Sequence, residues 1–500
     1  MIHTAMQRAG LAAATVVAVL LALVACGGGG VGSNGTGSPV VPGLSVGTVS
    51  GLGSVIVDGI RYDDSAAAVE IRRNTTQPEV GDVQLGHRVS LEFGTDTAGA
   101  RVLQRVELLP AVLGRVHERT ADTLGVLGQT VTVNTDPARG PVTVFEAPLG
   151  GLADVRLGDG VEVHGLALRT GSGVRDVRLV ASRIAARTSL SGVRVSGMVA
   201  DLSTTGGSGA RRFQLGGLSV ELPATATVLP AGRALENGLA VTVFGAEAAF
   251  DPDALTLRAG QVQVMAVGDT GATLQRAGLL GGMSGTGFDL DGVAVLVGAD
   301  TQILPAGRTL ANGAYVQVTA TLNPSGRWLA TRIEHLVTDT VSAELRGTLV
   351  DWSATARSFR LRDTPVFLTT ATRTDLSGCR ASALADGLYV DVKGTSTAQG
   401  LGAQTITCAQ EPKGSKSRLE RHGVVLSVDT AARHLGLRDL SGGAALTVTW
   451  TDQTYLGSGL TAEGLSALVG TTRQIEAEGT LSADGLQMAA RKIKLRTSRP

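Results

Sequence analysis

The segment Gly313-Ala314-Tyr315-Val316-Gln317-Val318 decides the fold class, because a glycine is followed by valines that alternate with a polar residue. Gly238-Leu239-Ala240-Val241-Thr242-Val243 has the same pattern. Alternate side chains of a strand point to opposite faces, so the valines face a core while Thr242 and Gln317 face solvent. The whole chain has 68 glycines and only 3% aromatic residues. Short β-branched segments between glycine-rich turns are typical of an all-β protein.

These two segments belong to a longer repeat with three signals, and signals that return in the same order indicate tandem copies. The first, Gly-x-Val or Gly-x-Leu, opens each copy at Gly47, Gly114, Gly197, Gly278, Gly347 and Gly423. The second, Gly-x-x-Val, marks the middle of five copies at Gly86, Gly158, Gly238, Gly313 and Gly387. The third, Ala-x-x-Ile or Ala-x-x-Val, marks the closing strand at Ala181, Ala259, Ala330, Ala403 and Ala490.

The repeat divides the chain into six β-domains, called units 1 to 6 below. Each offers about five strands, which bury a core only by curling into a small antiparallel barrel or a two-layer sandwich. The best helical candidate, Ala462 to Val469, is short and is interrupted by Gly464. The expected ranges are 45–110, 111–190, 191–267, 268–340, 341–412 and 419–496.

The three signals together resemble the bacterial family known as domain of unknown function 5666 (DUF5666). Its members resemble small OB-like β-barrels and often occur in tandem on exported lipoproteins, so the resemblance implies tandem OB-like barrels. It extends from Ser45 to Leu495 and is clearest in units 1 to 4. Unit 5, with its two cysteines, and unit 6, without a clear Gly-x-x-Val, depart from the pattern. The family implies no agreed activity and no catalytic residue.

The first 44 residues predict an exported, anchored protein. Arg8 precedes an uncharged apolar segment from Leu11 to Val24, which is short for a permanent membrane span and fits a secretion signal. Its ending, Leu23-Val24-Ala25-Cys26, resembles the lipobox of bacterial lipoproteins. We therefore expect a signal peptide over 1–25, lipidation of Cys26, and a flexible Gly/Ser tether over 26–44. The alternative is an ordinary signal peptide with an incidental cysteine.

The two other cysteines, Cys379 and Cys408, both lie in unit 5. Two remaining cysteines in an exported protein are expected to form a disulfide. Two buried free thiols, or half of a metal site, are the alternatives, and no histidine stands at ligand spacing beside either cysteine.

The sequence offers no catalytic site and no metal site. Gly282-Met283-Ser284-Gly285 has the wrong spacing for a nucleophile elbow. Asp289-x-Asp291-Gly292 lacks the later ligands of a calcium loop, which favours a β-turn. Glu411 to Arg418 is expected to be a solvated linker, with a docking patch for an anionic partner as the alternative. Each histidine after the signal is expected to be solvated or structural, because a zinc site or a triad would need convergence from several units. These histidines are His87, His117, His164, His335, His422 and His434.

Charge and composition bound the function. Lys plus Arg and Asp plus Glu both number 44, so no net field steers the chain to nucleic acid, and few aromatics are available to stack on bases. We therefore expect no nucleic acid partner. We expect a non-enzymatic cell-envelope lipoprotein without a cofactor, acting as a binding or spacer module. The partners would be the membrane, through the lipid on Cys26, and an envelope protein or glycan.

Three alternatives to this reading of the function stay open. The first is a glycan or ligand binder that gains avidity from repeated barrels. The second is an envelope enzyme. The third is a transmembrane barrel, against which the lipobox and the basic ending from Lys492 to Arg499 argue. Gly27 after the cysteine does not resemble the aspartate that retains lipoproteins in the inner membrane. This favours the outer membrane of a Gram-negative bacterium, on its periplasmic or its surface face.

Overall fold

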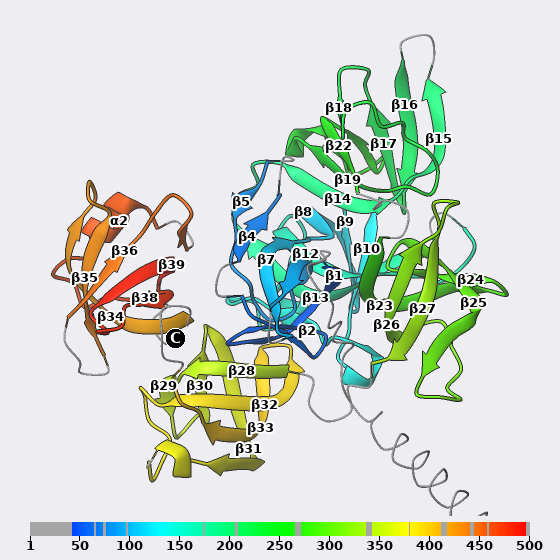
Figure 1. The fold of residues 1–500 in the computed structure, drawn as a ribbon. Helices are drawn as coiled ribbons and strands as arrows, with labels where there is room; N and C mark the ends of the chain where they lie inside the picture. The colour runs from blue at the N-terminus through cyan, green and yellow to red at the C-terminus, as the bar shows by residue number, and fades with distance from the viewer. Residues whose placement is uncertain are drawn as a thin grey trace, which may run out of the picture.

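The computed structural model places six sets of strands in chain order (Figure 1). Cys26, residues 1–42 and most of the expected linker between units 5 and 6 lie outside the described residues. No helix in the described part of the chain is long and apolar enough to cross a membrane. The described residues are 43–64, 67–73, 77–96, 99–173, 176–205, 209–265, 272–336, 343–379, 381–411, 418–440, 445–457 and 460–496.

Unit 4 shows the architecture most simply, because its five strands close into a ring. β23 (Thr273–Ser284) pairs with β24 (Gly287–Leu290), and β24 pairs with β25 (Val293–Leu304). β26 (Tyr315–Leu322) pairs with β27 (Trp328–His335) and returns to β23. β25 and β27 close the barrel as a parallel pair. The expected small β-barrel is therefore confirmed, and the expectation of antiparallel pairing throughout is wrong at this closing pair.

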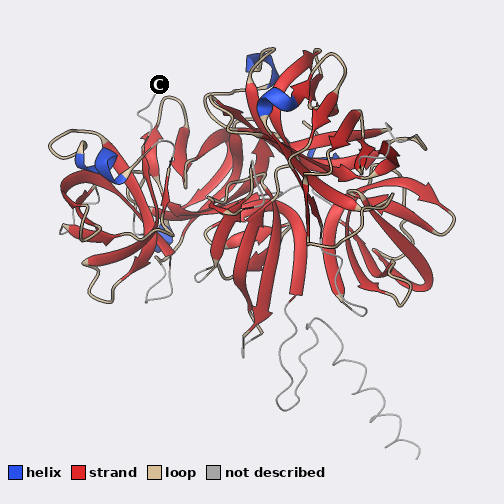
Figure 2. Cartoon of the chain, turned by 90° about the horizontal axis from the view of Figure 1, so that it is seen from above, coloured by secondary structure: helices blue, strands red, loops and turns tan. Residues whose placement is uncertain are grey.

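The other units contain the same succession of strands, with short 3-10 turns and one short helix between them (Figure 2). Unit 1 has β1 (Gly43–Leu52), β2 (Val55–Val57), β3 (Ile60–Tyr62), β4 (Ala68–Ile71), β5 (Glu79–Val80), β6 (Arg88–Thr95) and β7 (Arg101–Leu108). Unit 2 has β8 (Val112–Arg119), β9 (Thr123–Val126), β10 (Gln129–Val133), η1 (Pro137–Arg139), β11 (Val144–Phe145), η2 (Leu152–Asp154), β12 (Gly160–Arg169) and β13 (Val177–Arg187). Unit 3 has β14 (Val193–Met198), β15 (Ala200–Thr205), β16 (Ala210–Leu215), β17 (Leu218–Leu222), β18 (Thr227–Leu229), β19 (Ala240–Gly245), η4 (Glu247–Ala249), β20 (Phe250–Asp251), β21 (Thr256–Arg258) and β22 (Gln261–Val264).

The last two units follow the same plan. Unit 5 has β28 (Ala343–Thr348), β29 (Val350–Ser353), β30 (Ser358–Leu361), β31 (Thr364–Asp375), η5 (Ser377–Cys379), β32 (Tyr389–Thr397) and β33 (Gly400–Cys408). Unit 6 has β34 (Arg418–Asp429), β35 (His434–Asp439), β36 (Leu446–Thr449), β37 (Tyr455–Leu456), α2 (Ala462–Ser466), β38 (Gln474–Leu481) and β39 (Gln487–Leu495). The helix α2 begins where the sequence offered its best helical candidate, and Thr461 caps it by accepting the Gly464 N–H.

The first two sequence signals are the two sides of one contact. The glycine of each Gly-x-x-Val has a positive φ, between 83° and 91°, which favours glycine over any residue with a Cβ. Its N–H donates to the carbonyl of the third residue of the Gly-x-Val signal in the same unit. The signals therefore recur together because each barrel needs this turn. The five pairs are Gly86 to Val49, Gly158 to Val116, Gly238 to Val199, Gly313 to Leu280 and Gly387 to Leu349, at 2.7 to 2.9 Å.

The third signal marks a β-bulge in units 2, 4, 5 and 6. In unit 4, Ala330 pairs with Ala320 and Arg332 pairs with Thr319, so Thr331 is the extra residue on β27. The carbonyl of the alanine accepts a hydrogen bond from a threonine hydroxyl on, or just before, the strand that pairs in parallel with the closing strand. The same bond recurs in four units, from Thr143 to Ala181, Thr301 to Ala330, Thr372 to Ala403 and Thr454 to Ala490, at 2.5 to 2.7 Å.

The units are joined through their opening strands rather than strung out as separate barrels. β1 pairs in parallel with β23 of unit 4 and with β28 of unit 5, and β8 pairs with β14 of unit 3. Units 1 and 2 lie at the centre of the molecule (Figure 1). One apolar core runs through units 2 and 3, and another runs through units 1 and 5. The expectation that each unit closes its own core is therefore wrong for these four units, because paired strands bring their inner faces together.

Units 4 and 6 keep cores of their own. A small additional cluster, built from Leu166 and Leu168 of unit 2 with Ala277, Leu279 and Tyr315 of unit 4, fixes unit 4 to unit 2. Unit 6 differs from the others, since the described strands β34 to β39 pair only with one another. Its contacts with units 1 and 5 are mainly ionic and are described below.

Candidate functional site

The structure places the two unit 5 cysteines together. A disulfide joins Cys379, at the end of η5, to Cys408, at the end of β33, with their Cα atoms 5.6 Å apart. It ties the connection after β31 to the closing strand of the barrel. Cys26 lies outside the described residues, so its lipidation stays a prediction.

Two of the six histidines meet between units 1 and 2. The rings of His87 and His164 lie 4.4 Å apart, and both side chains are buried. His87 Nδ1 accepts the Gln84 N–H, and His164 Nδ1 accepts the Arg88 N–H. Burial, followed by the neighbouring His164 and Arg183, holds the pKa of His87 well below its ordinary value. Both rings are therefore neutral members of the junction between these units.

The carboxylate beside these rings is neutralised by arginines from both units. Arg73 Nε of unit 1 donates to Glu162 Oε2 at 2.7 Å, and Arg187 Nη2 of unit 2 donates to Oε1 at 2.8 Å. Burial alone would raise the pKa of Glu162, but His164, Arg187 and Arg73 hold it well below its ordinary value. The cluster holds the two units together, and each of its charges has a counter-charge.

A cavity of about 130 Å³ lies where four units meet. Unit 1 contributes the middle of β1 and the turn between β2 and β3, and unit 2 contributes the loop before β11. Unit 4 contributes Tyr315 and Leu336, and unit 5 contributes Ser396. The lining residues are Thr48, Val49, Ser50, Asp58, Gly59, Gly86, Gly140, Pro141, Val142, Val144, Tyr315, Leu336 and Ser396.

Asp58 is the one carboxylate in this lining. It holds the first position of the β2–β3 turn with a φ of 50°, and its Oδ2 accepts the Thr48 N–H at 3.1 Å. Its Oδ1 accepts the hydroxyl of Tyr315, which comes from unit 4. Burial raises the pKa of Asp58 to about 6, against the opposing effects of Arg88, Tyr315 and Thr48. Burial and Asp58 together raise the pKa of Tyr315 well above 10, so the phenol stays a donor.

Arg88 lies behind Asp58 and is already bound elsewhere. Its Nη2 donates to Asp291 Oδ2 at 2.5 Å and to the Ala277 carbonyl at 3.0 Å. Its Nη1 donates to the Thr48 hydroxyl at 3.3 Å. Arg276 shares the same carboxylate oxygen of Asp291 at 2.8 Å. The positive charge nearest to the cavity is therefore compensated on its far side.

Asp291 is a turn residue, as the sequence indicated, but its carboxylate does more than cap the turn. It has a φ of 51° between β24 and β25, and the N–H of Gly292 donates to Asp289 Oδ1. Asp291 Oδ1 accepts the Ala167 N–H of unit 2 at 2.7 Å, while Oδ2 binds Arg88 of unit 1. One hairpin tip of unit 4 thus binds two other units.

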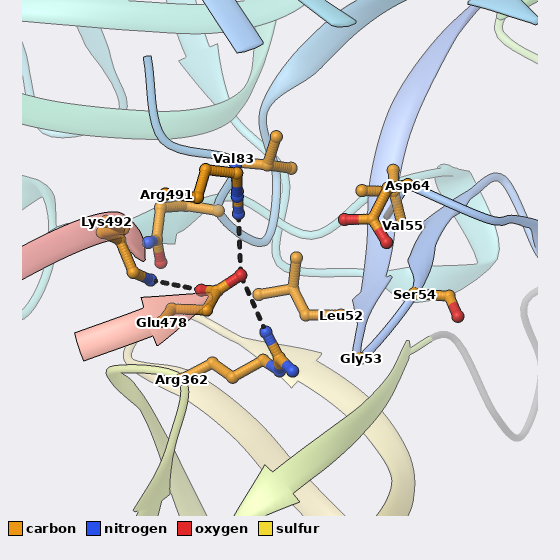
Figure 3. A pocket seen from close by; sticks show the side chains of 11 residues that line it. Leu52, Gly53, Ser54, Val55, Asp64, Val83, Arg362, Glu478, Arg491 and Lys492 are labelled. Carbon is orange, nitrogen blue, oxygen red and sulfur yellow. Dashed lines mark hydrogen bonds and ion pairs between the residues drawn. The ribbon is translucent and has the colours of Figure 1, made fainter. Parts of the chain in front are cut away.

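A second charged cluster joins unit 6 to units 1 and 5. Glu478 lies between three cations: Lys492 at 2.9 Å, Arg491 at 2.8 Å and Arg362 of unit 5 at 3.3 Å (Figure 3). Leu52, Val55 and Val83 of unit 1 close the space beside them, which measures about 10 Å³ and holds at most one water molecule. This space is too small for an organic ligand.

Three buried carboxylates of this cluster, on Glu420, Glu476 and Glu478, have the spacing of a metal site. The cation position is already filled, because Lys492 Nζ lies 3.1 Å from Glu476 Oε1 and Arg362 Nε lies 3.2 Å from Glu420 Oε1. Burial lowers the pKa of Lys492, but Asp82, Glu478 and Glu476 raise it well above its ordinary value, so the ammonium is permanent. The residues therefore fit a structural ion network better than a metal centre.

Sequence reasoning missed Asp58, Tyr315 and Arg88, because each meets its partner across unit boundaries. A weak signal existed in Asp58-Gly59 and Asp291-Gly292, which are typical hairpin turns. The same turn in unit 5 is Arg362-Asp363, and Arg362 also binds a neighbouring unit.

The family comparison matches the barrels just described. The model of Domain of unknown function (DUF5666) matches residues 278–334 in unit 4 and residues 347–407 in unit 5. Unit 5 was expected to depart from the family pattern because of its cysteines, but it matches the family model. Its Gly387 turn and its Ala403 bulge are both present. No curated protein matches the chain.

Two solved structures are similar to parts of the chain at low identity. One, titled "drosophila Unr CSD456", is 14% identical, covers 43% of this chain and 96% of its own, and has a TM-score of 0.11. The other is a multidomain protein with nucleic acid binding domains from Streptococcus pneumoniae. It is 15% identical, covers 45% of this chain and 74% of its own, and has a TM-score of 0.09. TM-scores this low contribute no argument about what this chain does.

The expectation that nucleic acid is excluded as a partner is corrected, because it rested on the net charge of the whole chain, which does not describe the charge of any one barrel. A protein with nucleic acid binding domains is among the similar structures. The fold and the family match agree with each other: two tandem segments of the chain, residues 278–334 and 347–407, match the model of the domain of unknown function DUF5666.

Proposed function

We propose that this protein is a lipid-anchored, non-catalytic binding module of the cell envelope, in which units 1, 2, 4 and 5 build one ligand pocket. The single observation on which the proposal rests is the cavity of about 130 Å³ lined by all four units. Few polar groups in a mostly apolar lining, with one carboxyl group of raised pKa, are typical of a small-molecule site. A spacer would need neither the cavity nor the carboxylate.

This arrangement favours one composite site over repeated weak sites. Tyr315 of unit 4 hydrogen-bonds Asp58 of unit 1, so neither barrel offers the pocket alone. Avidity between equivalent sites would instead require the same lining in each unit. The residues that line the cavity include no histidine, cysteine or lysine, and this supports binding without catalysis.

The pocket is tested by filling it. Val142→Phe places a ring in the cavity, and Leu486→Phe, at a position 46% exposed in unit 6, is the matched control. A small-molecule screen by ligand-observed NMR on residues 27–500 should find compounds that lose binding in Val142→Phe and keep it in Leu486→Phe. Compounds that bind both variants equally, or a screen without any ligand, would leave the spacer as the better account.

The anchor is tested separately with Cys26→Ala. The variant should move from the membrane fraction to the soluble envelope fraction, because the leader then provides no acylation site. Recovery of the variant in the membrane fraction would refute lipid anchoring. Protease treatment of intact cells producing the wild type tells a surface location from a periplasmic one.

A further inference from the structure

We infer that the cavity between units 1, 2, 4 and 5 binds a small organic ammonium ion with an apolar body of about six non-hydrogen atoms. This deepens the proposed function and rests on it. An engineered cavity of about 150 Å³ holds benzene, and the cavity described here is slightly smaller.

A single negative charge faces the cavity. Among the lining residues, Asp58 is the only one that is ionised at neutral pH. Its two oxygens accept one hydrogen bond each from Thr48 and Tyr315, and a carboxylate offers about four acceptor positions. Two positions therefore remain for a donor on the ligand. An ammonium ion supplies such donors together with the opposite charge.

Among the described residues, no Arg, Lys or His lines the cavity. Arg88, which lies nearest to Asp58, does not line the cavity and binds Asp291, Ala277 and Thr48. An anionic ligand would meet the Asp58 carboxylate without gaining an uncompensated cation. The charges thus select against carboxylates and phosphates.

The wall around the carboxylate combines one aromatic residue with apolar side chains. Tyr315 presents an aromatic ring to the cavity, and Pro141, Val142, Val144 and Leu336 supply apolar surface. An aromatic face attracts a cation at close range, while the aliphatic residues bury the body of the ligand. Strongly hydrated inorganic cations would gain nothing from these walls.

The pH dependence of ligand binding provides a second test, because Asp58 titrates. The groups that face it are Thr48 from β1, Arg88 from β6 and Tyr315 from β26. Since the pKa of Asp58 is raised to about 6, the carboxylate is charged at pH 8 and mostly neutral at pH 5. A primary alkylammonium ion keeps its proton at both values. Binding of the cation must therefore weaken as the pH falls through 6.

The test compares cyclopentylammonium with cyclopentanol, which has the same size and no charge, on residues 27–500. At pH 8 the ammonium ion should bind at least about tenfold more tightly, which is the effect of one charge-assisted hydrogen bond. This preference should shrink by up to about tenfold at pH 5, where roughly one Asp58 in ten is still ionised, and should vanish in Asp58→Asn. The control Asp452→Asn removes a carboxylate that is 83% exposed in unit 6, and should keep the preference.

The possible results separate the two proposals. Equal binding of the two probes at pH 8, or a preference that is as large at pH 5 as at pH 8, overturns the ammonium ligand even if Asp58→Asn fails to fold. If other compounds still bind wild type and lose binding in Val142→Phe, the pocket stands and only the ligand class is wrong. If Val142→Phe affects no compound, both proposals fail.

Discussion

Replacing Lys492 by methionine should loosen unit 6 more than any single change on its surface. The ammonium group is 3% exposed and lies 2.9 Å from Glu478, 3.1 Å from Glu476 and 3.6 Å from Asp82 of unit 1. Methionine keeps most of the apolar stem, so the change removes the charge with little loss of packing. Breaking a buried ion pair from one side typically costs about 3–5 kcal/mol.

The remaining cations place the expected cost at the lower end of that range. Glu478 keeps Arg491 and Arg362. Glu476 and Asp82 keep longer ion pairs with Lys494, at 3.7 and 3.8 Å, and Asp82 also keeps a hydrogen bond from Gln84 at 2.6 Å. We therefore expect a loss of about 3 kcal/mol in the free energy of unfolding of unit 6. Part of it should couple to Asp82, so a double-mutant cycle with Asp82→Asn measures the contribution of docking.

Urea unfolding followed through Trp450 measures this loss, since Trp450 belongs to the core of unit 6. Replacing Trp328 and Trp352 by phenylalanine leaves Trp450 as the only fluorescent tryptophan. Lys393→Met is the control, because its ammonium is 50% exposed and 3.9 Å from Glu344, where a pair is worth at most about 1 kcal/mol. If Lys492→Met shifts the Trp450 transition no more than this control, the buried network does not stabilise unit 6 as argued.

Three further changes test other parts of the structure. Replacing both Cys379 and Cys408 by serine removes the disulfide and should lower the free energy of unfolding in urea by about 3 kcal/mol, as expected for the loop that the disulfide closes. Equal stability of the oxidised wild type and this variant would contradict a stabilising role of the disulfide. The pKa values of His87 and His164 are lowered in the folded protein, so the unfolded chain binds more protons below pH 6.5. The stability measured by calorimetry should therefore fall as the pH drops from 6.5. A stability that is flat or rising there would be inconsistent with buried neutral rings. Gly313→Ala should destabilise unit 4 by about 1 kcal/mol. The cause is the φ of 83° alone, since an added Cβ would meet no atom within 4 Å. An unchanged melting temperature would show that the turn relaxes.

The barrels could be predicted from sequence because their causes are local. Period-two valines such as Val316 and Val318 indicate strands, and the Gly313 turn returns in five units with one geometry. The hydrogen bond from Gly313 to Leu280 joins two signals that lie within one repeat. Because these requirements are short-range, each copy meets them with the same residue types.

The candidate site could not be predicted, because its contacts cross from one copy to another. Asp58 and Tyr315 are 257 residues apart; Asp58 belongs to no repeated signal, and Tyr315 stands at a variable position of the Gly313-x-x-Val316 signal. Asp-Gly turns occur equally well on solvated hairpins, so Asp58-Gly59 alone does not predict a buried carboxylate. Which hairpin tip meets which barrel depends on the pairing of β1 with β23 and β28, and a single sequence does not specify that pairing.

The pairing of β1 also determines when unit 1 can finish folding. Leu44 of the first barrel pairs with Leu274, and Gly51 pairs with Glu344, so β1 is synthesised long before β23 and β28. Until those partners exist, its edges stay open to wrong neighbours, and closing such long loops is slow. A chain that stopped after its third barrel would therefore present unfinished edges, and the first barrel is complete only once the fifth has been made.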